Sequence, residues 1–348
     1  MTASISVIVP VLNEEKSIAS LLDALTDQLL AGDEVVVVDG GSTDGTATIA
    51  AQKGDPVRVL SAPGTNISQA RNAGVLAAAN DVIACTDAGC SPGSMWLDSL
   101  RSCVTSEPAP DLVTGIYEVS AGTPFEAAMA AACYPDPDAR QPSGWASVYG
   151  RLFGRTFDSA FPTGRSMAFT KRAWSRVGGF PEDLETAEDV TFGRSIAQAG
   201  LGAVLCPEAR VVWRQRPTFG STARMYFRYG SGGGRSQDAK VISRDVIRAA
   251  AYGLGVWGLV AGGNVMRAAI ALGAAVYLSV PLARAARGPH GAAAVPLVPV
   301  ALATKDLSKA AGCLIGLSSR RERSHPVQRD IIDDERAAPS DRSLDPKH

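Results

Sequence analysis

The sequence predicts an α/β protein with a largely parallel, mixed sheet flanked by helices, followed by a C-terminal membrane-associated helical region. Short apolar runs alternate with segments of helical periodicity over the first 120 residues, and short connections join them, which predicts the sheet. The charge pattern changes near residue 245, which predicts the helical region. At 348 residues the chain is long enough for one large domain with an appended segment.

The alternation begins at the N-terminus and runs strand, helix, strand. The expected strands are 5–9, 34–38, 57–60 and 82–86, and the expected helices are 14–30, 43–52 and 68–79. In the first helix, apolar residues recur at spacings of three and four from Ile18 to Leu29, which gives one face to pack on the sheet. Ligands bind at the carboxyl ends of strands in such sheets. We therefore expect the polar segments 10–14, 39–44 and 87–91 to converge on one crevice.

The C-terminal region is apolar and nearly free of acidic side chains. Residues 246–316 contain a single one, Asp306, and the runs 249–266, 268–283 and 288–304 carry no charged residue. A helix needs about 20 apolar residues to cross a membrane, so these runs are borderline in length. The arginines and lysines between them suit helix ends at lipid headgroups. We expect two short spanning helices or helices lying in the interface, with a buried helical subdomain of a soluble protein as the alternative.

These composition changes predict four segments. Residues 1–230 form the α/β domain, and residues 231–245 form a hinge or an active-site lid, because the run 227–235 is rich in glycine. Residues 246–317 are the membrane-associated helices, the last of which, 305–317, is weakly amphipathic and expected on the membrane surface. Residues 318–348 carry 14 charged side chains in 31 positions and are expected to be a disordered tail.

The composition also excludes several classes of protein. The net charge is −1, so no basic field is available to attract nucleic acid. The six cysteines form no C-x-x-C pair, and the N-terminal segment has neither a basic region nor a long apolar run. We therefore expect reduced, mostly structural thiols and no secretory signal peptide, which places the domain on the cytoplasmic face of a cell membrane.

Motifs for other nucleotide-binding folds and for histidine catalysis are also missing. The first strand leads into Pro-Val-Leu-Asn-Glu-Glu, which is neither a dinucleotide-binding turn nor a phosphate-binding loop with its lysine. The three histidines, His290, His325 and His348, all lie beyond the α/β domain. A histidine base or a Ser-His-Asp triad within that domain is excluded, so the general base is expected to be a carboxylate.

Carboxylates follow two of the expected strands. The second strand ends at Asp39, and Ser42 and Asp44 follow it; taken alone, these two are ordinary turn and helix-capping residues. The fourth strand leads into Asp87, where a carboxylate suits a hard divalent cation that bridges phosphate oxygens.

Taken together, six elements in this order resemble the family 2 glycosyltransferases, inverting enzymes of the GT-A fold that use nucleotide-diphospho-sugars. They are Val-Ile-Val-Pro-Val-Leu-Asn-Glu-Glu at 7–15, Val-Val-Asp-Gly-Gly-Ser-Thr-Asp-Gly-Thr at 37–46, Ala-Arg-Asn-Ala-Gly at 70–74, Thr-Asp-Ala-Gly at 86–89, Gly-Gly-Phe-Pro at 178–181 and Ala-Glu-Asp at 187–189. The resemblance covers roughly residues 4–230. It predicts a hexosyltransferase.

The resemblance implies a role for each matching residue. Asp189 is the general base, with Glu188 orienting or tuning it, and Asp87 stands at the first aspartate of the D-x-D metal motif. A base is needed to take the proton of the acceptor hydroxyl, and cationic charge is needed to stabilise the departing nucleoside diphosphate. The expected donor-binding residues are Pro10, Asn13, Glu14, Asp39, Ser42, Asp44, Arg71, Asn72, Asp87, Arg165, Arg214 and Arg216. Among them, Asp39 is expected to contact the nucleobase of the donor, and Arg71 is expected near its diphosphate.

Two departures from the family pattern concern the metal. Gly89 stands where many members carry the second aspartate of D-x-D, and Trp213 stands where many place a metal-binding histidine. Mg²⁺ or Mn²⁺ is then expected to be held by Asp87 with waters and phosphates. Alternatively, Arg214 or Arg216 takes over part of the leaving-group charge. Each of these arginines, and Arg165, is otherwise a solvated surface residue.

The leading functional hypothesis is transfer of a hexose from a nucleotide-diphospho-sugar to a lipid-linked or glycan acceptor at the membrane, in glycolipid or polysaccharide biosynthesis of the cell envelope. Prolines interrupt the apolar segment 120–165. An apolar, irregular segment before the membrane-associated helices suits a lipid or lipid-linked acceptor. A sugar nucleotidyltransferase is one alternative, although its glycine-rich loop is absent after the first strand. A catalytically silent membrane scaffold that retains the fold is the other.

Overall fold

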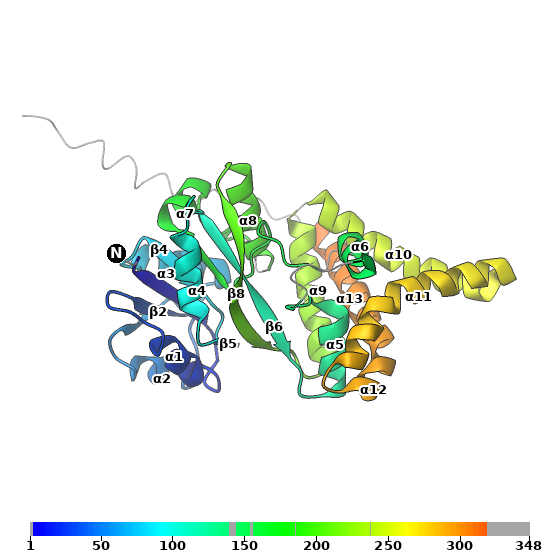
Figure 1. Ribbon diagram of the computed structural model, residues 1–348, viewed down its shortest axis with the longest axis horizontal. Helices are drawn as coiled ribbons and strands as arrows, with labels where there is room; N and C mark the ends of the chain where they lie inside the picture. The colour runs from blue at the N-terminus through cyan, green and yellow to red at the C-terminus, as the bar shows by residue number, and fades with distance from the viewer. Residues whose placement is uncertain (1–2, 139–143, 154–155, 185, 237, 319–348) are drawn as a thin grey trace, which may run out of the picture.

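The computed structural model describes residues 3–138, 144–153, 156–184, 186–236 and 238–318, and shows a sheet covered by helices, with a helical region on one side (Figure 1). The sheet order is β3-β2-β1-β4-β7-β6-β8-β5. Its strands are β1 (Ile5–Val11), β2 (Glu34–Asp39), β3 (Val57–Ser61), β4 (Val82–Cys85), β5 (Cys90–Pro92), β6 (Leu112–Ser120), β7 (Met167–Thr170) and β8 (Ala203–Arg214).

One or two helices lie between successive strands up to β8, except between β4 and β5, and the helices after β8 follow one another. They are α1 (Ile18–Thr26), α2 (Thr46–Ala51), α3 (Ile67–Ala77), α4 (Trp96–Val104), α5 (Pro124–Cys133), α6 (Gly144–Phe153), α7 (Lys171–Val177), α8 (Glu188–Gln198), α9 (Phe219–Arg235), α10 (Ala239–Ala261), α11 (Asn264–Arg287), α12 (Gly291–Ala294) and α13 (Val298–Ser318).

The four N-terminal strands of the prediction are confirmed and form the parallel part of the sheet. β1 pairs with β2 and β4, and β2 pairs with β3, all in parallel. The second half is mixed, because β7 runs antiparallel to both β4 and β6 while β6 and β8 are parallel. Leu21 and Leu25 of α1 are buried on one face of the sheet, and Val75 of α3 packs with Ile8 on the other. The expected α/β fold is therefore the observed one.

The glycine-rich run expected to form a hinge or lid is instead helical and packs closely. Residues 227–235 lie within α9, which crosses α13 through glycines on both helices. A Cβ on Gly230 would lie 2.0 Å from the carbonyl oxygen of Lys309, and one on Gly312 would lie 1.9 Å from that of Phe227. Glycine is unfavourable in a helix on its own, so contact between the two backbones decides this conformation.

Helix α13 contains the segment 305–317, which is expected on the membrane surface. It buries Leu302, Asp306 and Cys313 and contacts α9 and α5, while Leu307, Leu314 and Ile315 are about half exposed. The surface position of this segment stays a prediction. The charged tail expected at 318–348 lies almost wholly outside the described residues.

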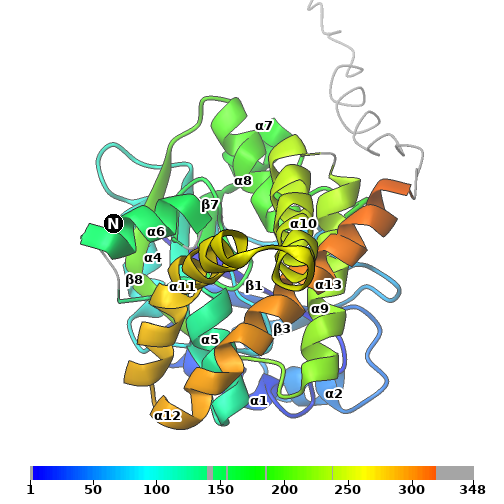
Figure 2. The same ribbon diagram turned by 90° about the vertical axis from the view of Figure 1, so that its right-hand side faces the viewer.

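Helices α10 and α11 form a hairpin that projects from the body of the protein (Figure 1), and Figure 2 looks toward this hairpin. Its base is held by Asp306, which accepts hydrogen bonds from the hydroxyls of Tyr252 at 3.2 Å and Tyr277 at 2.5 Å. Beyond this base, apolar side chains are 60–86% exposed: Leu254, Trp257, Val260, Val265 and Leu272. Within the described residues, α11 is the one helix long and apolar enough to cross a membrane.

Candidate active site

The loops after β1 and β2 lie against each other at the carboxyl edge of the sheet. The carboxylate of Asp39 accepts hydrogen bonds from the backbone N–H and the hydroxyl of Ser42, and that hydroxyl also accepts from the backbone N–H of Asn13 at 2.9 Å. The Asn13 side-chain oxygen in turn accepts from the backbone N–H of Thr43 at 2.9 Å. Asn13, at φ 56°, and Gly41, at φ 100°, provide the left-handed turns that this contact requires. The structure thus brings Asn13, Asp39 and Ser42 together, as expected, with Pro10 at the end of β1.

Asp44 and Glu14 make further contacts in the same region, where the backbone N–H of Glu14 also donates to the Thr46 hydroxyl at 2.8 Å. Asp44 accepts hydrogen bonds from the backbone N–H groups of Thr46 at 3.0 Å and Glu15 at 3.3 Å. The hydrogen bond from the Thr46 hydroxyl is the main cause that lowers the pKa of Asp44. Glu14 accepts from the Ser17 hydroxyl at 2.7 Å. These contacts are those of turn and capping residues, the alternative that the sequence left open for Asp44.

Arg71 joins three elements at the centre of the site. Its guanidinium is 2.8 Å from Asp87, which follows β4, and 2.6 Å from Glu188 at the start of α8. The Arg71 side chain is 1% exposed, and its pKa is raised by the charges of Asp87 and Glu188 against the effect of burial. Burial and the charge of Asp189 raise the pKa of Glu188 to about 7.

Asp189 lies next to this cluster, in the first turn of α8. One oxygen accepts the backbone N–H of Gly164 at 2.9 Å, and the other accepts the backbone N–H of Val190 at 2.8 Å. The helix begins after Ala187, at φ 65°, so both carboxylates of the first turn lie at the positive end of its dipole. Asp189 is half-buried and remains accessible. The expected base therefore has an oriented carboxylate at an accessible position.

Gly164 is a site residue that the sequence analysis did not single out. A Cβ at this position would lie 2.0 Å from Nη2 of Arg71, so only glycine allows the guanidinium to pass. Its N–H also orients Asp189. The run Thr-Gly-Arg-Ser after Pro162 gave a signal of irregular backbone, but the close contact depends on a residue 93 positions earlier in the chain.

Arg165 is held on aromatic rings, one of which belongs to the end of β8. Arg165 lies over the rings of Trp213, with its Cζ 4.2 Å from the ring centroid, and Tyr117, at 5.0 Å. Its guanidinium donates to the hydroxyls of Thr163 and Tyr229, each at 3.3 Å.

Burial alternates along the end of β8, so that Trp213 and Gln215 are buried while Arg214 and Arg216 are exposed. Alternate residues of an extended chain point to opposite sides. The structure therefore directs Arg214 and Arg216 away from the ring system that holds Arg165. Trp213, which the sequence marked as a lost metal ligand, is the platform for Arg165.

Asn72, an expected donor-binding residue, is held by four hydrogen bonds within the protein. Its side-chain oxygen accepts hydrogen bonds from the ring N–H of Trp174 and the backbone N–H of Phe180, and its N–H₂ group donates to the Phe180 carbonyl and to Glu182. These four bonds use both donors and both acceptor positions of the amide. Asn72 therefore fixes the loop before α8, and through it the start of the helix that carries Glu188 and Asp189.

The residues at the expected metal position do not form a metal-binding group. Among the described residues, no three His, Cys, Asp or Glu side chains gather closely enough to hold a cation. Asp87 already pairs with Arg71, Gly89 offers no ligand, and Trp213 is engaged with Arg165. A site with one shared carboxylate does not fit a resident divalent ion, whose oxygen ligands are normally several.

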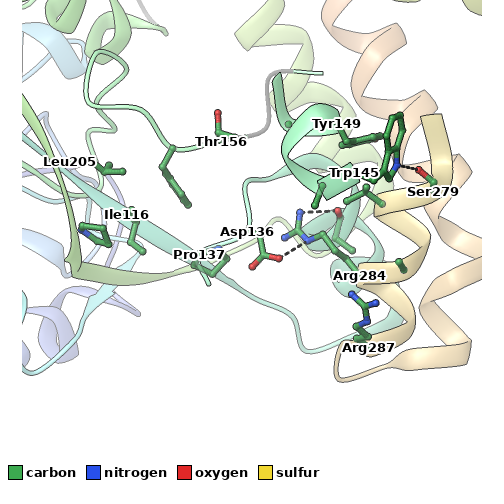
Figure 3. A pocket seen from close by; sticks show the side chains of 17 residues that line it. Ile116, Asp136, Pro137, Trp145, Tyr149, Thr156, Leu205, Ser279, Arg284 and Arg287 are labelled. Carbon is green, nitrogen blue, oxygen red and sulfur yellow. Dashed lines mark hydrogen bonds and ion pairs between the residues drawn. The ribbon is translucent and has the colours of Figure 1, made fainter. Parts of the chain in front are cut away.

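A cavity of about 490 Å³ lies at the base of the hairpin (Figure 3). It is lined by Trp145 and Tyr149 of α6, by Arg284 and Arg287 of α11, and on the opposite side by residues of β6 and β8. Arg284 donates to the carbonyls of Ala131, Tyr134 and Pro135 and lies 3.5 Å from Asp136. The cavity therefore joins an apolar, aromatic wall to a basic rim.

Comparisons with known proteins agree with the geometry. The model of a protein family, described as Glycosyl transferase family 2, matches residues 6–151. The glycosyltransferase AglE of Haloferax volcanii is 30% identical over 240 residues, which cover 66% of this chain and 72% of that protein. An uncharacterized glycosyltransferase of Mycobacterium tuberculosis is 41% identical over 120 residues, 34% of this chain and about half (51%) of that protein.

A solved structure matches almost the whole fold. The mannosyltransferase PcManGT from Pyrobaculum calidifontis, in complex with GDP-Man and Mn²⁺, superposes with a TM-score of 0.65 at 20% identity, over 92% of this chain and 89% of that one. The fold, the clustered carboxylates and these relatives lead to one conclusion: the chain is an enzyme that belongs to the family 2 glycosyltransferases.

Proposed function

We propose that this enzyme transfers a hexose from a nucleotide-diphospho-sugar to a lipid-linked or glycan acceptor by direct displacement, with inversion at the anomeric carbon. The observation that carries the proposal is the cluster in which Arg71 joins Asp87 and Glu188, with Asp189 beside them. In this proposal the donor's nucleoside binds at the loops after β1 and β2, and its diphosphate reaches toward the guanidinium groups. PcManGT, of the same fold, is in complex with GDP-Man, which supports a donor of this class.

Asp189 acts as the general base in this proposal. The Gly164 and Val190 N–H groups fix the direction of its carboxylate at the helix N-terminus, so that it takes the proton of the acceptor hydroxyl as that oxygen attacks. Glu188 tunes this base through its charge. Because the acceptor attacks the face opposite the leaving diphosphate, a single displacement inverts the configuration.

The hairpin and its cavity support a membrane-bound acceptor. Arg267 near the hairpin tip and Arg284 near its base are separated by 17 residues. At about 1.5 Å per residue this spacing corresponds to roughly 26 Å, close to the ~30 Å of a bilayer's hydrocarbon core. We place Arg248, Arg284 and Arg287 at the cytoplasmic face, as the positive-inside rule favours. The basic rim of the cavity then lies where an anionic lipid headgroup meets the protein.

The assigned base is tested by Asp189→Asn, with Asp183→Asn, an exposed aspartate five residues from Glu188, as the matched control. Full-length protein in detergent receives radiolabelled GDP-mannose or UDP-glucose and vesicles of total host lipid. Label extracted into chloroform–methanol reports a lipid acceptor, and label that stays in polymer reports a glycan. We expect Asp189→Asn to lower transfer by about 10²–10⁴-fold with donor affinity unchanged, and Asp183→Asn to transfer like wild type.

The transfer rate, nucleotide binding and the identity of the product separate the alternatives. If Asp189→Asn transfers at the wild-type rate, the base is wrongly assigned. If the wild-type protein binds no nucleotide, the chain is a silent scaffold. If it makes a nucleotide-sugar from a sugar phosphate and a nucleoside triphosphate, it is a nucleotidyltransferase. The anomeric configuration of the product, measured by NMR, tests inversion.

A further inference from the structure

Arg165 is a guanidinium without a protein anion. Among the described residues no carboxylate lies within ion-pair distance of it, and its polar contacts are two long hydrogen bonds to neutral hydroxyls. Its Nε is buried with no hydrogen-bond partner in the described part of the chain. The aromatic rings of Trp213 and Tyr117 support its planar face. The residue as a whole is half-buried, so an incoming group can reach it.

This arrangement is energetically incomplete without a ligand. Taking a charged group partly out of water is costly unless an opposite charge or full hydrogen bonding replaces the water. Ring faces offset only a small part of this cost. The amide of Gln215, two residues after Trp213, is 1% exposed, and neither its nitrogen nor its oxygen has a partner among the described residues. The guanidinium on its rings is the feature that points to an anionic ligand.

The position of Arg165 directs this ligand to the reaction centre. Its neighbour Gly164 donates its N–H to Asp189 and lies against Arg71. The charge of Asp87 also acts on Arg165, after the larger effects of burial, Tyr229 and Tyr117 on its pKa. Trp213, which lies under the guanidinium, pairs with Cys90 of β5, and the backbone N–H of Cys90 donates to the carbonyl of Asp87 at 3.0 Å. The ring that holds Arg165 is therefore joined to the segment that carries the carboxylate of the expected metal motif, which is where the proposed function puts the donor's diphosphate.

We propose that Arg165, held on the rings of Trp213 and Tyr117, binds the leaving diphosphate in place of a divalent cation, so that donor binding does not require a metal. The inference rests on the proposed function and deepens it. The guanidinium is permanently charged, and its planar fork matches two phosphate oxygens. As the bond from the anomeric carbon to the diphosphate oxygen breaks, that oxygen takes the electron pair, and Arg165 stabilises the charge.

Trp213 is a positioning residue in this scheme. Its ring, 8% exposed, forms the floor under the guanidinium and does not itself contact the diphosphate. A ring of similar shape should keep Arg165 in place, whereas an aliphatic side chain should not. Trp213→Phe and Trp213→Leu therefore separate a platform role from a merely apolar one.

The test is calorimetric binding of GDP and UDP to full-length protein in detergent, once with EDTA and once with Mn²⁺. We expect binding of one nucleotide in EDTA with at most a threefold gain on adding Mn²⁺. Arg165→Gln should weaken the EDTA affinity at least tenfold, Arg165→Lys by less, and Arg176→Gln, an exposed arginine on α7, should leave it unchanged. Trp213→Leu should weaken it, and Trp213→Phe should retain most of it. Near-UV circular dichroism and the melting temperature show that each variant is folded.

The outcomes separate the inference from the function on which it rests. Wild-type binding that appears only with Mn²⁺, or a folded Arg165→Gln that binds in EDTA like wild type, overturns the inference and leaves the transferase intact. A tenfold loss in Arg214→Gln or Arg216→Gln, with none in Arg165→Gln, assigns the role to the exposed arginines instead. Absence of binding by the wild type under both conditions overturns the proposed function itself.

Discussion

Two arginines of the candidate site, Arg71 and Arg165, are stabilised in opposite ways. Arg71 is 1% exposed and pairs with Glu188 and Asp87, whereas Arg165 lies on two aromatic rings and has no carboxylate partner in the described chain. The carboxylates of Glu188 and Asp87 balance the charge of Arg71 and fix the position of its guanidinium. The charge of Arg165 has no such carboxylate within the described chain. A buried charge therefore indicates a ligand site when the protein does not supply the opposite charge.

The largest expected effect is on stability, at the compensated arginine. Arg71→Met leaves Glu188 and Asp87 without their cation and should cost about 3–5 kcal/mol in the free energy of unfolding. The matched control is Arg172→Met, whose side chain is 78% exposed beside Asp111; an exposed pair of this kind contributes at most about 1 kcal/mol. Urea denaturation measures both. Equal losses in the two variants would contradict the structural role assigned to Arg71.

The contrast between the arginines also shows what the sequence could and could not predict. The parallel strands and their polar ends are local patterns, so β1 to β4, Asp39 and Asp87 were predictable. Arg71, Glu188 and Asp189 followed from the family motifs. The platform under Arg165 was not predictable, because Tyr117 and Trp213 lie on two strands whose pairing no local pattern specifies.

The prediction of a hinge or lid at the glycine run of α9 was wrong for a related reason. Local propensity favours a flexible segment, but contact with α13 requires glycine at the crossing and so selects a helix. Likewise, the side to which Arg214 and Arg216 point depends on how β8 pairs with β5 and β6. Long-range packing decided each of these cases.

The second prediction concerns the acid that helps compensate Arg71. Burial and the charge of Asp189 raise the pKa of Glu188 from 4.5 to about 7, while Arg71, which also holds Asp87, lowers it. Between these pH values the folded protein retains a proton that the unfolded chain releases. The contribution of Glu188 to stability therefore falls as the pH rises through this window, by up to about 1.4 kcal/mol per pH unit.

Glu188→Gln removes this titration and provides the comparison. The stability of wild type minus that of the variant, from urea denaturation at pH 5, 6, 7 and 8, should decline up to about pH 7 and then level off. A difference that stays constant, or rises with pH, would show that Arg71 keeps Glu188 ionised throughout.

The third prediction tests the space that Arg71 occupies. In Gly164→Ala the new methyl group would lie 2.0 Å from Nη2 of Arg71, so the guanidinium must shift away from Asp87. We expect a loss of about 1–3 kcal/mol in stability from this overpacking, together with at least tenfold slower transfer. Gly220→Ala is the control, because a Cβ there meets no atom within 4 Å. If Gly164→Ala retains wild-type transfer, the fixed position of Arg71 is not needed.

The smallest effect on the stability of the free protein is expected at Arg165, the arginine without a carboxylate partner in the described chain. Arg165→Met removes a cation–π contact worth about 0.5–2 kcal/mol but also removes the cost of a partly desolvated charge. The two terms oppose each other, so the stability of the free protein should change by less than about 1 kcal/mol. Adding the nucleoside diphosphate should then raise the melting temperature of wild type and not that of the variant, because a ligand stabilises only the state that binds it. If Arg165→Met instead destabilises the free protein as much as Arg71→Met does, Arg165 is a structural residue, since its charge then contributes to the fold without any ligand.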